Sequence, residues 1–512
     1  MSASTERKMR QAAREAGTDK KTLALEKAAK EQAKSKRRWT IGTVAVVLAV
    51  ALVLLLNSSL MNKLPAFSVG DKTFNTAEVS YRYAAQYFNF ANQYGQYASL
   101  FGLDTSNGIK GLANQPCNMN DGTWKDYFMD AAKEEMVQTT VLNKYAAEKG
   151  ITLDEEELAQ IESAFDGVEE QAKSNGWANA NRMIAANYGD GVNLSLVRQA
   201  YRDGSLANKA LQALTDSFTY DEQARETMYQ SLANEEDYFD YVYCYVAAEM
   251  VETTDDAGET SSKPTEETLA AAKAIADQIA ETYAKAKGDS PAARLNNAAA
   301  TEGQTAVPQT HVKGSSIFTA AEWLCDAARQ PGDMTVEEDA SGVYVVVFIS
   351  RDDNHYHTVN VRHILIKAEA DEDGNYSDEA KAAAKARAEE ILAEYESGEK
   401  TEERFAALAE QYSEDTGSNT KGGLYENVAR DQMVQEFNDF CFAPHESGDT
   451  GIVYGESGSY AGYHVMYYVG EGMLYSDSIA ENELRNADVS AWLEEAKAAN
   501  PTKESFGMKF VG

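Results

Sequence analysis

The hydrophobic positions of the chain fall into three successive patterns. Residues 39–61 form an apolar run without a charged side chain. From about residue 62 to 235, apolar residues recur at intervals of three and four, which predicts amphipathic helices. Beyond residue 236, short runs of β-branched and aromatic residues alternate with alanine-rich segments, which predicts strands and helices. The chain is therefore predicted to be an α+β protein that begins with an apolar segment and a mainly helical region.

The apolar run from Trp39 to Met61 is long enough to span a membrane. Its 23 residues would form a helix of about 34 Å, compared with a bilayer core of about 30 Å. The 38 residues before it carry 12 Lys and Arg against five acids and end in Lys36, Arg37 and Arg38. By the positive-inside rule this tail is cytoplasmic and the rest of the chain is extracytoplasmic. The alternative, a cleaved signal peptide, usually has a shorter apolar run.

The helical region should begin with a short hairpin and a capped helix. Asn75 or Thr76 is a candidate N-cap, and Glu78 follows at capping-box spacing. Gly150 should end a later helix, and Thr152 or Asp154 should begin the next one. The many tyrosines at the start of the region are more typical of a helical core than of a peptide-binding surface.

The region after residue 236 contains two copies of one pattern. Each copy begins with a strand, continues through an acidic loop and alanine-rich helices, and closes with a second strand. Val242 and Val361, and later Gly342 and Gly462, are matched landmarks separated by 119 and 120 residues. Such regular offsets indicate an internal duplication of a small α+β domain of about 115 residues. The alternative is two unrelated segments with a similar α/β pattern.

Charge and cysteine usage exclude several classes of function. The formal net charge is −35, so the chain beyond the basic tail carries about −42, and nucleic-acid phosphate would be repelled. The four cysteines are far apart and lack metal-binding spacing; Cys244 and Cys441, in apolar runs, are interpreted as core residues. Metal and nucleotide motifs are absent from the sequence, so no cofactor is expected.

Two histidines in predicted strands are the main candidates for chemistry. His363 stands in V-R-H-I-L-I and His464 in G-Y-H-V-M. The sequence alignment of the two copies matches His363 with Cys244 and His464 with Tyr344. Because the first copy keeps the strands without the imidazoles, the pattern favours a functional site. The alternative is that each histidine is structural and is satisfied by one hydrogen bond.

An ordered series of motifs in the second copy resembles the parvulin-type peptidyl-prolyl isomerases. V-R-H-I-L-I is followed by F-A-A-L-A-E-Q-Y-S-E-D, K-G-G-L, Q-M-V-Q-E-F and G-Y-H-V-M, over about residues 358–471. The whole layout of tether, helical region, parvulin modules and C-terminal helix is similar to the extracytoplasmic foldases of the PrsA and SurA type. That resemblance implies a chaperone domain built from the N-terminal helices together with a helix near the C-terminus.

The parvulin resemblance implies a role for each matching residue. His363 and His464 would lie side by side under the active site, with Asp415 in their hydrogen-bond network. Met433 and Phe437 would hold the proline ring. Gly422 and Gly423 are followed by Leu424 and Tyr425 where the family usually has G-G-D-L-G, and Val434 stands where many relatives have glutamine, so the loop departs from the family pattern.

The first copy lacks residues that match the site residues of the parvulin family. Cys244 and Tyr344 replace the histidines, and Glu302 is the nearest acid to the position of Asp415. The first copy is therefore predicted to be an inactive parvulin-like module, kept for spacing or peptide binding.

The sequence thus predicts a membrane-anchored prolyl isomerase that assists the folding of exported, proline-containing polypeptides. The alternative is a non-catalytic extracytoplasmic holdase that uses its parvulin modules as scaffold. The predicted parts are a basic tail, a membrane helix, a helical chaperone-like domain, a degenerate parvulin-like domain, a parvulin domain and a C-terminal helix packed on the chaperone-like domain (1–38, 39–61, 62–235, 236–355, 356–473 and 474–512).

Overall fold

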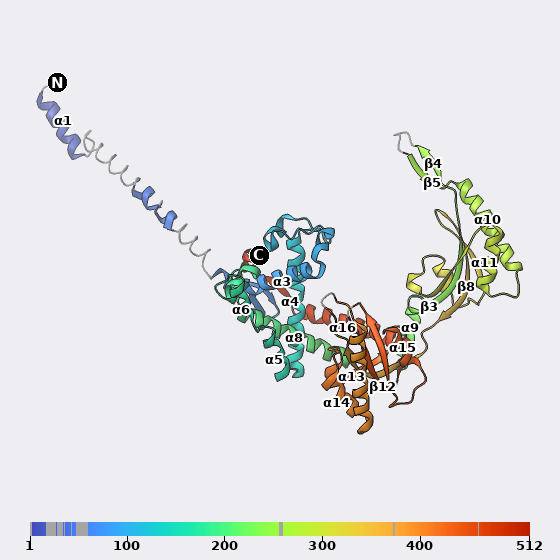
Figure 1. Cartoon of the computed structure of the whole chain (residues 1–512). Helices are drawn as coiled ribbons and strands as arrows, with labels where there is room; N and C mark the ends of the chain where they lie inside the picture. The colour runs from blue at the N-terminus through green and yellow to red at the C-terminus, as the bar shows by residue number, and fades with distance from the viewer. Residues whose placement is uncertain are drawn as a thin grey trace. The chain divides into compact units, whose positions relative to one another are not determined.

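The computed structural model describes residues 3–16, 27, 34, 36–41, 43–47, 60–254, 260–371, 374–458 and 460–512. The chain divides into two compact units (Figure 1). The first contains Met1–Phe218 and Asp488–Gly512, and the second contains Thr219–Ala487.

The predicted membrane segment, Trp39–Met61, lies largely outside the described residues. Among the residues that the structure does describe, no helix is both long and apolar enough to cross a membrane. Helix α1 (Ala3–Glu15) belongs to the basic tail.

The first unit is mainly helical and contains one small sheet. Strands β1 (Pro65–Val69) and β2 (Lys72–Asn75) form the predicted hairpin, and β13 (Thr502–Glu504) pairs with β1. Asn75 caps α3 (Thr76–Tyr94) in a capping box with Glu78, as predicted. The remaining α-helices are α4 (Trp124–Lys149), α5 (Glu155–Ser163), α6 (Val168–Ser174), α7 (Ala180–Tyr188) and α8 (Leu194–Ser217). Short 3-10 turns are η1 (Met61–Lys63), η2 (Gly95–Phe101), η3 (Gly108–Asn114) and η6 (Phe506–Phe510).

Helix α4 ends as the sequence predicts. Gly150 adopts the left-handed conformation, with φ of 70°, and Asp154 then caps α5. A residue without a Cβ enters this conformation at little cost, which is why glycine terminates the helix here.

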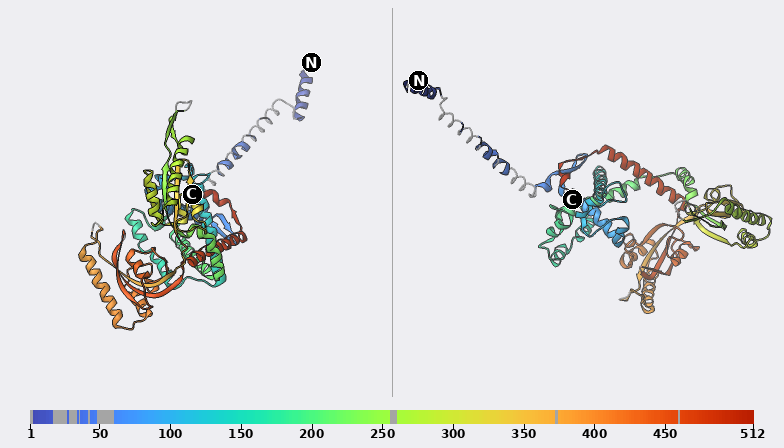
Figure 2. Two further views of the ribbon diagram at one scale, coloured as in Figure 1. Left: turned by 90° about the vertical axis from the view of Figure 1, so that its right-hand side faces the viewer. Right: turned by 90° about the horizontal axis from the view of Figure 1, so that it is seen from above.

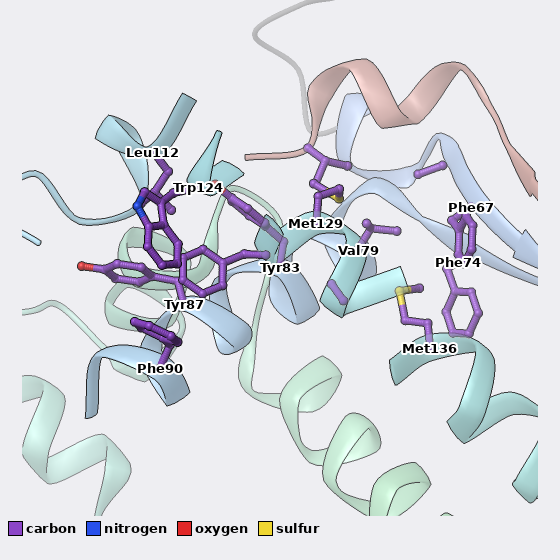
Figure 3. Packing of buried hydrophobic residues seen from close by; sticks show 14 of the residues in the cluster. Phe67, Phe74, Val79, Tyr83, Tyr87, Phe90, Leu112, Trp124, Met129 and Met136 are labelled. Carbon is purple, nitrogen blue, oxygen red and sulfur yellow. The ribbon is translucent and has the colours of Figure 1, made fainter. Parts of the chain in front are cut away.

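The core of the first unit is rich in aromatic residues (Figure 3). Trp124 and Phe128 are almost fully buried and stack with their ring centroids 5.4 Å apart. Tyr83, Tyr87 and Phe90 from α3 belong to the same cluster. The tyrosines at the start of the helical region are therefore largely core residues, as their spacing predicted.

A long C-terminal helix, α16 (Tyr475–Ala499), begins in the second unit and ends in the first. The right-hand view of Figure 2 shows it as one continuous helix. Near its end, Trp492 packs edge-on against Tyr145 of α4, with ring centroids 5.2 Å apart. The C-terminal end of α16 thus contributes to the core of the helical unit.

The second unit contains two modules with the same sheet. After α9 (Glu222–Glu236), module 1 runs from β3 to β8 and has strand order β6-β3-β8-β7; module 2 runs from β9 to β12 and has order β10-β9-β12-β11. This equivalence is what the internal duplication predicts. The elements of module 1 are β3 (Tyr238–Ala247), β4 (Val251–Thr254), β5 (Thr260–Lys263), α10 (Glu266–Lys285), α11 (Pro291–Thr301), β6 (Ala306–Lys313), η4 (Gly314–Ser316), α12 (Ala321–Leu324), β7 (Met334–Glu338) and β8 (Gly342–Asp352). Those of module 2 are β9 (His357–Lys367), α13 (Asp378–Ser397), α14 (Glu402–Tyr412), η5 (Asn419–Lys421), β10 (Leu424–Val428), α15 (Gln435–Phe442), β11 (Thr450–Ser457) and β12 (Tyr460–Leu474).

Each sheet is covered on one face by a pair of helices. In module 1, α10 and α11 lie together on one face, as the views in Figures 1 and 2 show, and pack on Val242, Cys244 and Val246. In module 2, α13 and α14 pack on Ile364 and Ile366. At the first acidic loop, β4 and β5 form an antiparallel pair that the sequence analysis did not predict.

The strand register corrects one match between the two copies. Gly342 pairs with Ala247 in module 1, and Gly462 pairs with Lys367 in module 2. His363 lies four residues before Lys367, and the residue four before Ala247 is Tyr243. His363 therefore corresponds to Tyr243, and the predicted match with Cys244 is wrong. A shift of one residue in a strand moves a side chain to the other face, and Cys244 indeed lies in the helix-covered core.

Candidate active site

The two central strands of module 2 bring His363 and His464 together. Strands β9 and β12 are antiparallel neighbours, with His363 opposite Met466 and His464 opposite Leu365. The histidines are thus diagonal neighbours on one face of the sheet, close enough for long side chains to touch. Their rings are nearly parallel, with centroids 5.1 Å apart, and the two Nδ1 atoms are separated by 2.9 Å. The rings are adjacent, as the sequence analysis predicted.

Asp415 fixes the outer nitrogen of His363. Its Oδ2 atom lies 2.9 Å from Nε2 of His363 and also accepts hydrogen bonds from the hydroxyl groups of Ser418 and Tyr425. The amide of Gly417 donates to Oδ1. Since an ionised carboxylate only accepts hydrogen bonds, Nε2 of His363 carries a proton.

A hydrogen-bond chain through the histidine pair is built on that assignment. When Nε2 carries the only ring proton of His363, its Nδ1 is an acceptor and Nδ1 of His464 donates to it. Nε2 of His464 is then the acceptor for the hydroxyl of Tyr460, 3.0 Å away. The chain runs from Tyr460 through His464 and His363 to Asp415, and it leaves each ring nitrogen with a partner.

The surroundings set the charge of two members of this chain. Burial, and then the proximity of His363, lower the pKa of His464 to about 3, so this ring is neutral at physiological pH. The hydrogen bond from His363 holds the pKa of Asp415 well below its usual range, so Asp415 is ionised. His363 and His464 are 3% and 4% exposed, which makes the pair a nearly dry polar group on an apolar sheet.

The predicted apolar residues lie beside the pair. Phe437, from α15, meets the rings of His363 and His464 edge-on at centroid distances of 5.5 and 5.4 Å. Met433 is half-buried and packs against the cluster that contains Phe437 and Met466. Cys441 is a buried free thiol in the same cluster, and burial raises its pKa to about 12, as suits a core residue.

The loop that departs from the parvulin pattern still closes around the site. Gly422 and Gly423 both have positive φ, at 64° and 70°. The carbonyl of Gly423 accepts a hydrogen bond from the amide of His363 at 2.9 Å. Tyr425, which belongs to the unusual sequence, places its hydroxyl 3.1 Å from Asp415. The departure therefore adds a phenol to the network.

Sequence reasoning missed three members of the network: Ser418, Tyr425 and Tyr460. Tyr460 lies four residues before His464 in the same strand, so the two-residue periodicity of strands already placed both on one face. Ser418 lies three residues after Asp415, in a turn whose geometry the sequence alone does not fix. The position of Tyr425 depends on the fold of the loop.

Module 1 has no imidazole at the equivalent place. Tyr243 and Tyr344 take the positions of His363 and His464, with ring centroids 5.7 Å apart. Glu302, the candidate acid of this copy, directly follows α11.

Comparison with known families matches residues 344–467 to the PPIC-type PPIASE domain. The second module is a parvulin-type domain. The match begins within β8 and ends within β12, so it includes the histidine pair, Asp415 and both apolar residues.

A curated relative of this parvulin domain is foldase protein PrsA 3 of Bacillus anthracis. It is 35% identical over 114 residues, which are 22% of this chain and 32% of the relative. The chain thus spans about a third of the length of that relative, and the alignment supports a likeness of domain rather than of whole proteins.

Two solved structures extend the comparison. PrsA from Bacillus cereus has 25% sequence identity over 31% of this chain and 56% of its own, with a TM-score of 0.18. PrsA from Bacillus subtilis has 14% identity over 75% of this chain and 89% of its own, with a TM-score of 0.26. At these TM-scores the likeness does not establish a shared overall arrangement. Together with the domain match, the sequence similarity makes the chain a parvulin-containing protein similar to the PrsA foldases.

Proposed function

We propose that this chain is a membrane-anchored peptidyl-prolyl isomerase that assists the folding of exported proteins. The observation that carries the proposal is the hydrogen-bonded chain of Tyr460, His464, His363 and Asp415 beneath Phe437. In this proposal residues 39–61 are the single membrane helix, the N-terminus is cytoplasmic and the chain from residue 62 onward is extracytoplasmic. The clients are unfolded or partly folded polypeptides that contain proline.

The site suits rotation about an X-Pro bond. The barrier is about 20 kcal/mol, and no covalent bond is made or broken. Catalysis therefore needs an environment that favours the twisted amide over the planar one. Phe437 and Met433 would hold the proline ring in an apolar pocket, away from water.

The histidine pair would provide fixed polarity rather than proton transfer. Its hydrogen bonds to Asp415 and Tyr460 lock each ring in one orientation, so its dipoles need no reorganisation when the amide twists. The lowered pKa of His464 keeps that ring neutral, which argues against a role as a general acid. In this proposal His363, His464 and Asp415 are the catalytic residues.

A non-catalytic holdase is the second candidate, because the helical unit offers its own groove. Tyr145 of α4 and Trp492 of α16 line a cavity of about 250 Å³ with Ala496 and Ala499. In this alternative, the helical unit and the end of α16 bind unfolded chains, and both modules serve as scaffold.

Proline-limited refolding of a test protein separates the two candidates. Catalysis predicts that the full chain accelerates the slow phase and that His363→Ala and His464→Ala abolish most of the acceleration. His355→Ala is the matched control, since His355 is exposed and lies outside the site. Equal rates for the wild type and the two pair variants would contradict catalysis. Suppression of client aggregation without acceleration would favour the holdase.

A further inference from the structure

Module 1 keeps the shape of the active site but changes its chemistry. Phe318 meets Tyr243 edge-on, with centroids 5.3 Å apart, much as Phe437 meets His363 in module 2. Phe318 also lies edge-on to Tyr344, at 6.1 Å. Three aromatic rings thus form the same triangle in both modules, but phenols replace the imidazoles.

This group, which we call the tyrosine site, consists of Tyr243, Tyr245, Tyr344, Phe318 and Glu337. Its phenylalanine is far more accessible than the one in module 2. Phe318 is 58% exposed, whereas Phe437 is 2% exposed. Each of the three tyrosines is half-buried, so part of each ring is accessible.

Glu337 gives the tyrosine site a negative charge. Glu337 on β7 lies directly opposite Tyr344 on β8, and residues directly opposite share one face of a sheet. In module 2 the residue opposite His464 is Val453. The only side-chain hydrogen bond that the structure gives Glu337 within the described residues comes from the hydroxyl of Thr335, and no basic side chain there pairs with it. The acid therefore remains available to a cation.

The charge of the whole module is complementary to a basic partner. Residues 238–352 contain 19 acids and eight Lys and Arg. Such an excess attracts cationic segments over distances of about 10 Å at ordinary ionic strength. The faces of tyrosine rings also attract ammonium and guanidinium groups.

We propose that the tyrosine site binds a lysine or arginine side chain of an extended client segment. Arginine should bind better, because its flat guanidinium stacks on a phenol ring and can pair with Glu337 at the same time. The identity of the client rests on the proposed function, but the cation site itself does not depend on catalysis in module 2. Module 1 would thus hold basic segments, while module 2 acts on proline.

Fluorescence anisotropy with the full chain tests this site. The probes are three labelled Gly-Ser peptides that differ only in carrying two arginines, two glutamines or two prolines. The arginine peptide should bind most tightly, and its affinity should fall as ionic strength rises from about 0.01 to 0.15 M. Equal affinity for the arginine and glutamine peptides would overturn the proposal. The proline peptide reports on module 2 of the same chain, and loss of arginine-peptide binding on addition of excess unlabelled proline peptide would place that binding in module 2 and overturn the proposal.

Two neighbouring acids provide a matched pair of variants. Glu337→Gln should weaken binding of the arginine peptide by about twofold to fivefold, the effect of one exposed ion pair. Glu338→Gln removes the same charge from the next residue, which pairs with Lys273, and should leave binding unchanged. Equal effects of the two variants would mean non-specific attraction and would overturn the site.

A second substitution tests the aromatic part. Tyr344→Ala should weaken the binding of the arginine peptide further and leave the binding of the glutamine peptide unchanged. Self-association of the wild type that Tyr344→Ala abolishes would instead identify a second copy of the chain as the occupant and overturn the proposal. Isomerase turnover is measured in the same samples; its absence would end the catalytic proposal without affecting the binding result.

Discussion

The Nδ1 atoms of His363 and His464 lie 2.9 Å apart, although the two residues are 101 positions apart in the chain. One Nδ1 must donate and the other accept, so the pair is ordered only if a third group fixes the direction. Asp415 fixes it at one end and Tyr460 at the other. This two-ended arrangement suggests that Tyr460 is a positioning residue.

Tyr460→Phe should therefore reduce turnover while preserving the fold. Without the phenol, Nε2 of His464 loses its donor and becomes an unpaired acceptor in a buried site, while Asp415 still fixes the proton on Nδ1 of His464 through His363. We expect turnover to fall by about threefold to tenfold, the value of one hydrogen bond of ~1 kcal/mol. Nitrogen NMR should show the proton of His464 on Nδ1 in both proteins, with the Nε2 resonance shifted in the variant because its hydrogen bond is lost. Tyr463→Phe, on the opposite face, is the control, and an unchanged Nε2 resonance together with unchanged turnover in Tyr460→Phe would refute the role.

The depressed pKa of His464 predicts that module 2 loses stability in acid. The unfolded chain binds a proton at His464 below about pH 6.5, whereas the folded state does so only near pH 3. Between those values the unfolded state binds more protons, so stability falls as pH is lowered. Asp415 adds a further loss below about pH 3.8, because its folded pKa is lower still.

Hydrogen exchange of β9 and β12 amides in urea, measured from pH 7 to 4, checks this expectation. His464→Gln cannot titrate, so its stability should vary less with pH than that of the wild type, by up to about 1.4 kcal/mol per pH unit. His355→Gln, at an exposed position, should retain the wild-type dependence. Parallel profiles for wild type and His464→Gln would show that this ring does not control acid stability.

Gly423→Ala should disturb the site through the backbone. An added Cβ would lie 2.2 Å from the carbonyl oxygen of His363 and 3.0 Å from Cβ of Ala409, at a φ of +70°. Gly374 has a similar φ, +83°, but no atom within 4 Å of the added carbon. Gly374→Ala should thus lower the free energy of unfolding only by the ~1–2 kcal/mol that a left-handed backbone conformation costs a residue with a Cβ. Gly423→Ala should lower the free energy of unfolding by more than Gly374→Ala does and should accelerate hydrogen exchange of the His363 amide. Equal losses of stability in the two variants would mean that the backbone around Gly423 shifts without cost.

Substitutions in module 1 should not affect isomerase turnover. Tyr243→Phe, Tyr344→Phe and Cys244→Ser all lie outside module 2, and in module 1 no imidazole occupies the equivalent positions. We expect turnover within about twofold of wild type for each, measured by proline-limited refolding. A large loss in the tyrosine variants would show that module 1 takes part in catalysis.

The sequence predicted the main residues of the site but not the complete hydrogen-bond network that connects them. Alternation in V-R-H-I-L-I placed His363 on one face, and the parvulin resemblance supplied Asp415, Met433 and Phe437. The match of His363 with Cys244 failed because the offset between copies varies along the chain. Only hydrogen-bonded register decides which of two adjacent strand residues faces the site.

The sequence by itself determined the local features, because caps, glycine turns and strand alternation depend on residues a few positions apart. Asn75, Gly150 and the duplicated strands are of this kind. Tertiary structure alone decided which distant groups meet: β13 pairs with β1, Trp492 packs on Tyr145, and Tyr425 reaches Asp415. It also decided the charge of the site, because the pKa of His464 depends on burial and on a ring from another strand, neither of which a linear pattern contains.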